Sequence, residues 1–183
     1  MKNILFTLTI VGLIAMSCSK SPNRFAIENH SIGLLTDSTQ IKDLATIFDL
    51  DSVVNLSKGN KFTDRINDID VFEKGGKLLL TLSPKSVSDS TSTIEAIKVY
   101  DKRFKTTEGI NTESTFGDIK TKMKIKKIEN TIRNIVVFLE NSPVYLTIDK
   151  KELPAEFQFD MSKKIEAINI PDTAKIKYFM IGW

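Results

Sequence analysis

The chain has few of the residues on which most metal sites and many catalytic sites depend. Its 183 residues include one cysteine, Cys18, and one histidine, His30. A lone thiol cannot form an internal disulfide bond, and one histidine with no second cysteine or histidine leaves zinc sites and Cys/His catalysis without ligands. The sequence therefore predicts no metal site and no cofactor.

Recognisable catalytic motifs are also absent. The sequence contains no nucleophile elbow, no phosphate-binding loop and no dinucleotide fingerprint. The pairs Asp49-x-Asp51 and Asp68-x-Asp70 lack the glycine and the terminal glutamate of a calcium-binding loop. We therefore expect a protein that is not an enzyme. A sequence does not show which carboxylates the fold brings together, so a hydrolase that uses such a pair remains an alternative.

Charge of either sign is nearly balanced. The chain has 26 basic and 23 acidic residues, and removal of an N-terminal segment that contains Lys2 would leave 25 against 23. Such a balance argues against a dedicated polyanion binder, so no nucleic-acid partner is expected.

The N-terminus carries a short apolar run from Ile4 to Met16, preceded by Lys2. One positive charge, a short apolar core and small residues before a cut site are typical of a secretory signal. A membrane-spanning helix needs about 20 apolar residues, so this run is too short to cross a bilayer comfortably. We predict that residues 1–17 are a signal peptide.

The four residues Ala15-Met16-Ser17-Cys18 resemble the lipobox of bacterial lipoproteins, although that family usually has leucine at the position of Ala15. The resemblance implies lipidation of Cys18, which would begin the mature protein, with residues 18–24 as a short tether. Several acyl chains, at about 0.8 kcal/mol per buried methylene, make a firm anchor. In Gram-negative lipoproteins, Ser19 in place of aspartate favours the outer membrane. We expect the protein to lie on its periplasmic face.

Three pairs of segments recur in the same order along the chain. Residues 33–48 match 109–123, residues 71–82 match 137–148, and "TIEAIKVYD" (93–101) matches "KIEAINIPD" (164–172). Matches in one order indicate a duplication. We predict two tandem repeats, 25–101 and 102–183, which share one core or sheet because each is short for independent folding.

Each repeat reads as a short helix followed by antiparallel strands. Helical spacing predicts a helix over 41–48, and Thr115 with Asp118 fits a capping box for a helix that continues to about Met123. Hairpins are expected around Gly75-Gly76 and around residues 141–143. Both Ile-Glu-Ala-Ile segments are interpreted as strands, and residues 175–182 as a closing strand. The predicted class is α+β, with a 3–5-stranded antiparallel sheet in each repeat.

The segments that start at Gly33 and Gly109, each followed by a predicted helix, also resemble distantly the β-lactamase-inhibitor-protein-like fold. That fold includes small outer-membrane assembly lipoproteins. The resemblance implies a protein-binding scaffold, and it assigns no individual binding residue.

The two predicted repeats differ most between the hairpin and the Ile-Glu-Ala-Ile segment. Residues 83–93 fill this place in the first repeat and residues 149–164 in the second. The second segment contains apolar residues in a polar setting, and aromatic residues are frequent anchors of interfaces. Candidate partner contacts are therefore Leu153, Pro154, Phe157 and Phe159. The alternative is that Phe157 and Phe159 pack inward on a strand.

These observations favour a lipid-anchored, non-enzymatic module of the cell envelope that binds a protein partner. A periplasmic carrier of a small apolar ligand is an alternative, and it predicts a deep apolar cavity. A hydrolase is the other alternative, and it predicts a cleft with two facing carboxylates.

Overall fold

The computed structural model describes residues 23–55, 68–86 and 88–183 of the chain. The predicted signal peptide, the lipidation site Cys18 and tether residues 18–22 lie outside these described residues. Within the described ranges, no helix is both long enough and apolar enough to cross a membrane.

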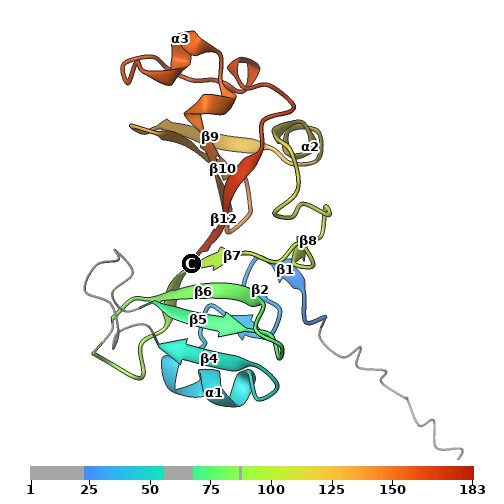
Figure 1. Ribbon diagram of the computed structural model, residues 1–183, viewed down its shortest axis with the longest axis vertical. Helices are drawn as coiled ribbons and strands as arrows, with labels where there is room; N and C mark the ends of the chain where they lie inside the picture. Colours follow the sequence, from blue (N-terminus) through green and yellow to red (C-terminus); the bar gives the residue numbers. More distant parts are fainter. Residues whose placement is uncertain (1–22, 56–67, 87) are drawn as a thin grey trace, which may run out of the picture.

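Eight antiparallel strands form the main sheet, in the order β4-β5-β6-β7-β12-β11-β10-β9. Their bounds are β4 Ser52–Asn55, β5 Ile69–Phe72, β6 Leu78–Pro84, β7 Ile94–Val99, β9 Ile125–Asn130, β10 Asn134–Leu139, β11 Val144–Asp149 and β12 Ile176–Gly182. Sequential strands lie side by side in each half of the sheet. The two halves meet where β7 pairs with β12 (Figure 1).

The pairing of β7 with β12 is antiparallel and fully apolar on one face. Val99 lies opposite Phe179, and Ile97 lies opposite Ile181. All four side chains are at most 3% exposed. The same face continues into both halves, because Leu80 pairs with Val99 and Leu146 pairs with Phe179. One hydrophobic core therefore runs across the whole sheet.

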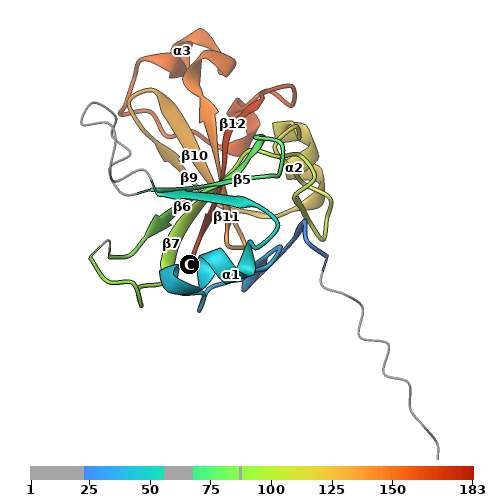
Figure 2. The same cartoon turned by 60° about the horizontal axis from the view of Figure 1, so that its bottom comes forward.

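A second, smaller sheet and the helices surround this core. The smaller sheet has the order β3-β2-β1-β8, formed by β1 Ala26–Glu28, β2 Ser31–Ile32, β3 Leu35–Thr36 and β8 Lys105–Thr106, with β1 and β8 parallel. The helical segments are η1 Ile41–Asp43, α1 Leu44–Ile47, α2 Phe116–Lys122, η3 Lys150–Glu152, α3 Ala155–Gln158 and η4 Ala167–Asn169. Figures 1 and 2 place α1 at one end of the molecule and α3 at the other.

The architecture confirms the predicted α+β class, with mostly strands, two sheets and a few short helices. Several local expectations are also confirmed. Gly75 and Gly76 have φ values of 112° and 92° in the first hairpin turn, which the absence of a side chain permits. Thr115 and Asp118 form the expected capping box at the start of α2.

One strand prediction is wrong. The first Ile-Glu-Ala-Ile segment forms β7, but the second one, from Ile165 to Ile168, leads into the short 3₁₀ helix η4 and forms no strand. The place next to β7 and β11 is occupied by β12, which corresponds to the predicted closing strand over 175–182. Side chains of β12 alternate between the two faces of the sheet, so that Phe179 and Ile181 are buried in the core at this position.

A cluster of charges links the end of β7 to the β5–β6 hairpin. The Asp101 carboxylate is buried and accepts hydrogen bonds from Arg103, and it forms an ion pair with Lys77 at 2.9 Å. Arg103 also donates two hydrogen bonds of 2.8 Å to Glu73. Burial alone would raise the pKa of Asp101, but the hydrogen bonds from Arg103 and Lys77 outweigh it and hold this pKa below its usual value.

We expect the Asp101→Asn variant to be less stable by about 2 kcal/mol at neutral pH, because Arg103 and Lys77 lose their shared anion. A carboxyl group with a lowered folded-state pKa contributes stability above its unfolded pKa of about 3.9 and loses it as the pH falls. Urea unfolding from pH 7 to pH 2 should therefore show a steeper acid loss in the wild type than in Asp101→Asn. Parallel curves would contradict this assignment.

Candidate functional site

Of the four candidate contact residues, the structure leaves two at the surface. Phe159 is 88% exposed and Pro154 is exposed, whereas Leu153 is 3% exposed and belongs to the core. Phe157 is half-buried and packs against the core. Segment 149–164 contains η3 and α3 rather than a strand, so the position of Phe159 just after α3 turns its ring outward.

Two further exposed apolar side chains lie at the same end of the sheet. Met161 is 48% exposed, and Ile132, in the turn between β9 and β10, is 79% exposed. We call Phe159, Met161 and Ile132 the apolar tip. Exposed apolar groups gathered at one place are a common property of interaction surfaces.

The apolar tip is held to the sheet by side chains beneath it. The Asn130 amide at the end of β9 donates hydrogen bonds to the carbonyl oxygens of Asp160 and Lys163, at 3.1 and 3.0 Å. The ammonium group of Lys150 lies 3.5 Å from the Met161 sulfur, and Lys150 is itself only 3% exposed. These contacts fix the segment that presents Phe159 and Met161.

The sheet face opposite the core has a different character. Cross-strand neighbours form one continuous row on it, in the order Val54, Asp70, Thr81, Lys98, Met180, Tyr145, Phe138 and Lys127. We call this side the outer face. Its ring systems contact one another or a lysine, because the Phe138 and Tyr145 rings stack at 5.6 Å and Lys98 lies 3.8 Å from the Tyr178 ring centre.

Many aromatic rings and lysines of the outer face thus contact one another. Lys98 also lies 5.0 Å from the Tyr100 ring centre, and Lys127 lies 5.8 Å from that of Phe138. Such cation–π contacts stabilise each pair by about 0.5–1 kcal/mol at an exposed position. Burial, and then the nearby charge of Glu95, raise the pKa of Tyr145, so its hydroxyl stays protonated at neutral pH. No comparable contacts cover the apolar tip within the described chain.

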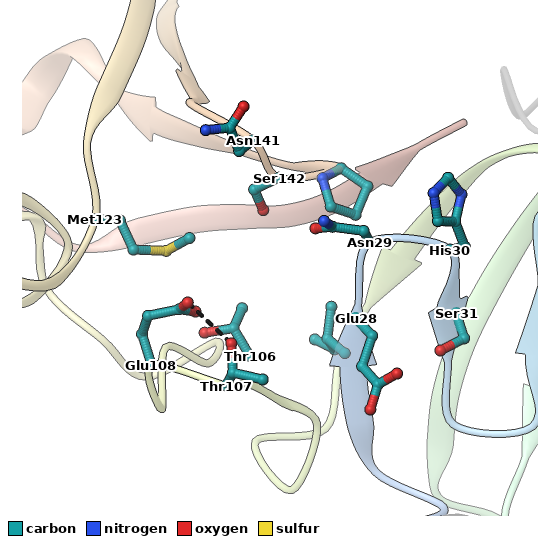
Figure 3. A pocket seen from close by; sticks show the side chains of 12 residues that line it. Glu28, Asn29, His30, Ser31, Thr106, Thr107, Glu108, Met123, Asn141 and Ser142 are labelled. Atoms are coloured by element: carbon teal, nitrogen blue, oxygen red, sulfur yellow. Dashed lines mark hydrogen bonds between the residues drawn. The ribbon is translucent and has the colours of Figure 1, made fainter.

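A cleft opens where three turns approach one another. Asn29 and His30 form the β1–β2 turn, Thr107 and Glu108 follow β8, and residues 141–143 form the β10–β11 turn (Figure 3). The hollow has a volume of about 380 Å³. A second hollow of about 570 Å³ shares five lining residues with it and extends to Lys85 and Trp183. We call the two hollows together the turn cleft.

Two glutamates, Glu28 and Glu108, line the first hollow of the turn cleft. Burial raises the pKa of Glu108, but hydrogen bonds from its own backbone N–H and the hydroxyls of Thr107 and Thr106 outweigh this and lower it. A carboxylate of lowered pKa is a poor proton donor at neutral pH. Figure 3 shows Glu28 and Glu108 on opposite sides of the hollow rather than facing each other.

Within the described ranges, His30 has one hydrogen-bond partner, the Asp37 carboxylate, 2.7 Å from its Nδ1. Its side chain is 84% exposed. Among the described residues, no group of three His, Cys, Asp or Glu side chains is placed to hold a metal ion. The contact with Asp37 orients the imidazole at the rim of the turn cleft. Within the described ranges, no further side chain completes a metal site around this pair.

Sequence reasoning did not find the turn cleft. Its walls come from three turns far apart in the chain, near residues 29, 107 and 142. One signal was available, because Asn141 lies in the predicted hairpin turn and adopts a positive φ of 53°, which asparagine tolerates better than most residues. Ile132 was missed because a single apolar residue in a turn has no periodic neighbours.

Comparisons with known proteins identify a protein of similar fold but indicate no activity. The structure is similar to that of the uncharacterized protein yfeY from Escherichia coli, with a TM-score of 0.53 and 15% sequence identity. The similarity covers 87% of this chain and 99% of the other. No protein family model matches the chain, and no curated protein matches it in sequence.

The Asn130→Ala variant should loosen the apolar tip without unfolding the sheet. It removes the hydrogen bonds from the Asn130 amide to the carbonyl oxygens of Asp160, Met161 and Lys163, which we expect to lower the free energy of unfolding by about 1–2 kcal/mol. Amide hydrogen exchange over 158–164 should accelerate, while exchange in β7 and β12 stays slow. Unchanged exchange in this segment would show that Asn130 does not hold it.

Proposed function

We propose that the protein is a lipid-anchored, non-enzymatic lipoprotein of the cell envelope that binds a protein partner through its apolar tip. The single observation that supports this binding role most strongly is the exposure of Phe159 and Met161 on a segment fixed by Asn130 and Lys150, together with that of Ile132 in the β9–β10 turn. Fixed apolar groups lose little conformational entropy when a partner covers them.

The first described strand and the apolar tip lie in different parts of the molecule. In Figure 1, β1, which contains the first described strand residues, lies in the half with α1, and α3 lies at the far end of the other half. An acyl group on Cys18 would hold the first half near the bilayer. The tip would then be directed away from the outer membrane, into the periplasm.

We also propose that the scaffold arose by duplication, with repeats 25–101 and 102–183. Each half contributes a run of four consecutive strands to the main sheet. In each half, the residue at the N-cap position of a helical segment forms an isolated antiparallel β-bridge with the residue just before the last strand. Gln40, before η1, pairs with Thr93, and Thr115, before α2, pairs with Lys175. The second Ile-Glu-Ala-Ile match does not contribute to this correspondence, because only its first copy is a strand.

The anchor predicts a defined chemical form of the native protein. Mass spectrometry of the polypeptide purified from membranes should show a chain that begins at Cys18 and carries acyl groups. A Cys18→Ser variant should leave the membrane fraction. An unmodified thiol or an intact leader in the native protein would contradict the proposed anchor.

The apolar tip predicts a specific crosslink in the native envelope. A photo-crosslinking amino acid at position 159 should give a discrete adduct with a different protein, and Ile132→Ser should reduce its yield severalfold because part of the buried contact is lost. Leu50 provides the matched control, because it is 68% exposed and follows shortly after α1, the helix at the end opposite α3.

The same crosslinker at position 50 should give no such adduct. Equal adducts from positions 50 and 159 would indicate random collision. An adduct formed only with a second copy of this chain would replace the proposed partner with self-association. Either result would overturn the proposal.

A further inference from the structure

The turn cleft has the dimensions of a ligand site rather than of a surface irregularity. Its two hollows, of about 380 and 570 Å³, share Asn29, His30, Asn141, Ser142 and Pro143. Sites for small molecules typically have volumes of about 300–1,000 Å³. The walls are turns anchored on strands, because β10 and β11 belong to the main sheet and β1 and β2 to the smaller one. The lining is therefore largely preformed.

Uncharged hydrogen-bonding groups dominate the lining. The amides of Asn29 and Asn141 have no hydrogen-bond partner within the described ranges, and Figure 3 shows Asn29 reaching toward the Asn141–Ser142 turn. A carboxamide offers a donor and an acceptor side by side, so it can bind two neighbouring hydroxyl groups at once. Two free amides that line both hollows suit a ligand that has several hydroxyl groups.

The charges in the turn cleft do not suit a strongly anionic ligand, because the carboxylates of Glu28, Asp37 and Glu108 line it beside one lysine. Lys85 is the single Lys or Arg among the described lining residues, whereas phosphate sites usually combine several cations. The Asp37 carboxylate already faces His30 at 2.7 Å. Thr107 donates a hydrogen bond to Glu108. A purely apolar ligand would leave the two asparagine amides without partners, which costs free energy.

An aromatic surface completes the far hollow. Trp183 lines it together with Gly182, and the absence of a side chain at Gly182 leaves room for the Tyr145 ring, because a Cβ there would lie 3.2 Å from that ring. An indole presents an apolar face together with one polar N–H group. The Trp183 Nε1–H is buried and has no acceptor among the described residues, so the apolar surface of the ring is what this residue offers to a ligand.

Sugar rings have this combination of properties, with hydroxyl groups at the rim and an apolar C–H face. We propose that the turn cleft binds a neutral oligosaccharide, with Asn29 and Asn141 hydrogen-bonded to ring hydroxyl groups and Trp183 beside an apolar sugar face. This site is independent of the apolar tip, because none of the three tip residues lines either hollow. The protein partner and the glycan would therefore bind at separate places.

The chain contains a single tryptophan, so ligand binding in the far hollow can be followed by its fluorescence. We suggest calorimetry and fluorescence titration of the mature protein with tetrasaccharides of β-1,4-linked N-acetylglucosamine, β-1,4-linked glucose and α-1,4-linked glucose. At least one should bind saturably and change the Trp183 emission. Inorganic phosphate and decanoate represent the ionic and apolar ligand classes, and neither should bind.

The variants Asn29→Ala and Asn141→Gly should each weaken saccharide binding about tenfold, because each removes a bidentate hydrogen-bonding group. Glycine at 141 keeps the positive φ accessible, so the turn is retained. Phe159→Ser should leave saccharide affinity unchanged, which separates this proposal from the one about the apolar tip.

Three results would overturn the assignment. These are the absence of saturable binding by all three tetrasaccharides, binding of phosphate or decanoate in their place, and saccharide affinity that both asparagine variants leave unchanged while their urea unfolding curves match the wild type. A failed crosslink at position 159 would leave the saccharide site unaffected.

Discussion

The antiparallel pairing of β7 with β12 is the interaction on which the rest of the structure depends. It joins two four-stranded runs into one sheet, and Val99, Ile97, Phe179 and Ile181 make its inner face apolar and fully buried. Without it, each half would have an exposed strand edge and a core open on one side. A short chain thereby acquires one core instead of two small ones.

The joined sheet also determines where the surfaces lie. Its inner face is covered by the core, and its outer face is occupied by aromatic rings and lysines that contact one another. Exposed and uncovered groups are consequently found at the ends of strands. The apolar tip lies at the β9–β10 turn and just after α3, and the turn cleft lies where the β10–β11 and β1–β2 turns meet. Function is expected at such places because loops tolerate change while the strands hold them in position.

Local patterns were predictable where one segment provided all the information. The capping box of Thr115 and Asp118 and the Gly75-Gly76 turn need only neighbouring residues, and both form as expected. The strand prediction for the second Ile-Glu-Ala-Ile segment was wrong because the sequence offers two apolar segments that could pair with β7, and β12 is the one that does. Alternation alone cannot tell which of two apolar segments a distant strand will accept. Similarly, nothing in the sequence indicated that Leu153 would be buried and Phe159 exposed.

The sequence by itself determined the α+β class, most strands, both helix starts and the expectation of an exported, lipid-bearing chain, because each rests on residues close together in the chain. The tertiary structure alone decided the strand order, the buried Asp101–Arg103 contact, the apolar tip and the turn cleft. The physical reason is that pairing, burial and shared walls depend on residues that are distant in sequence. Asn29 and Asn141 become neighbours only after the two halves have joined.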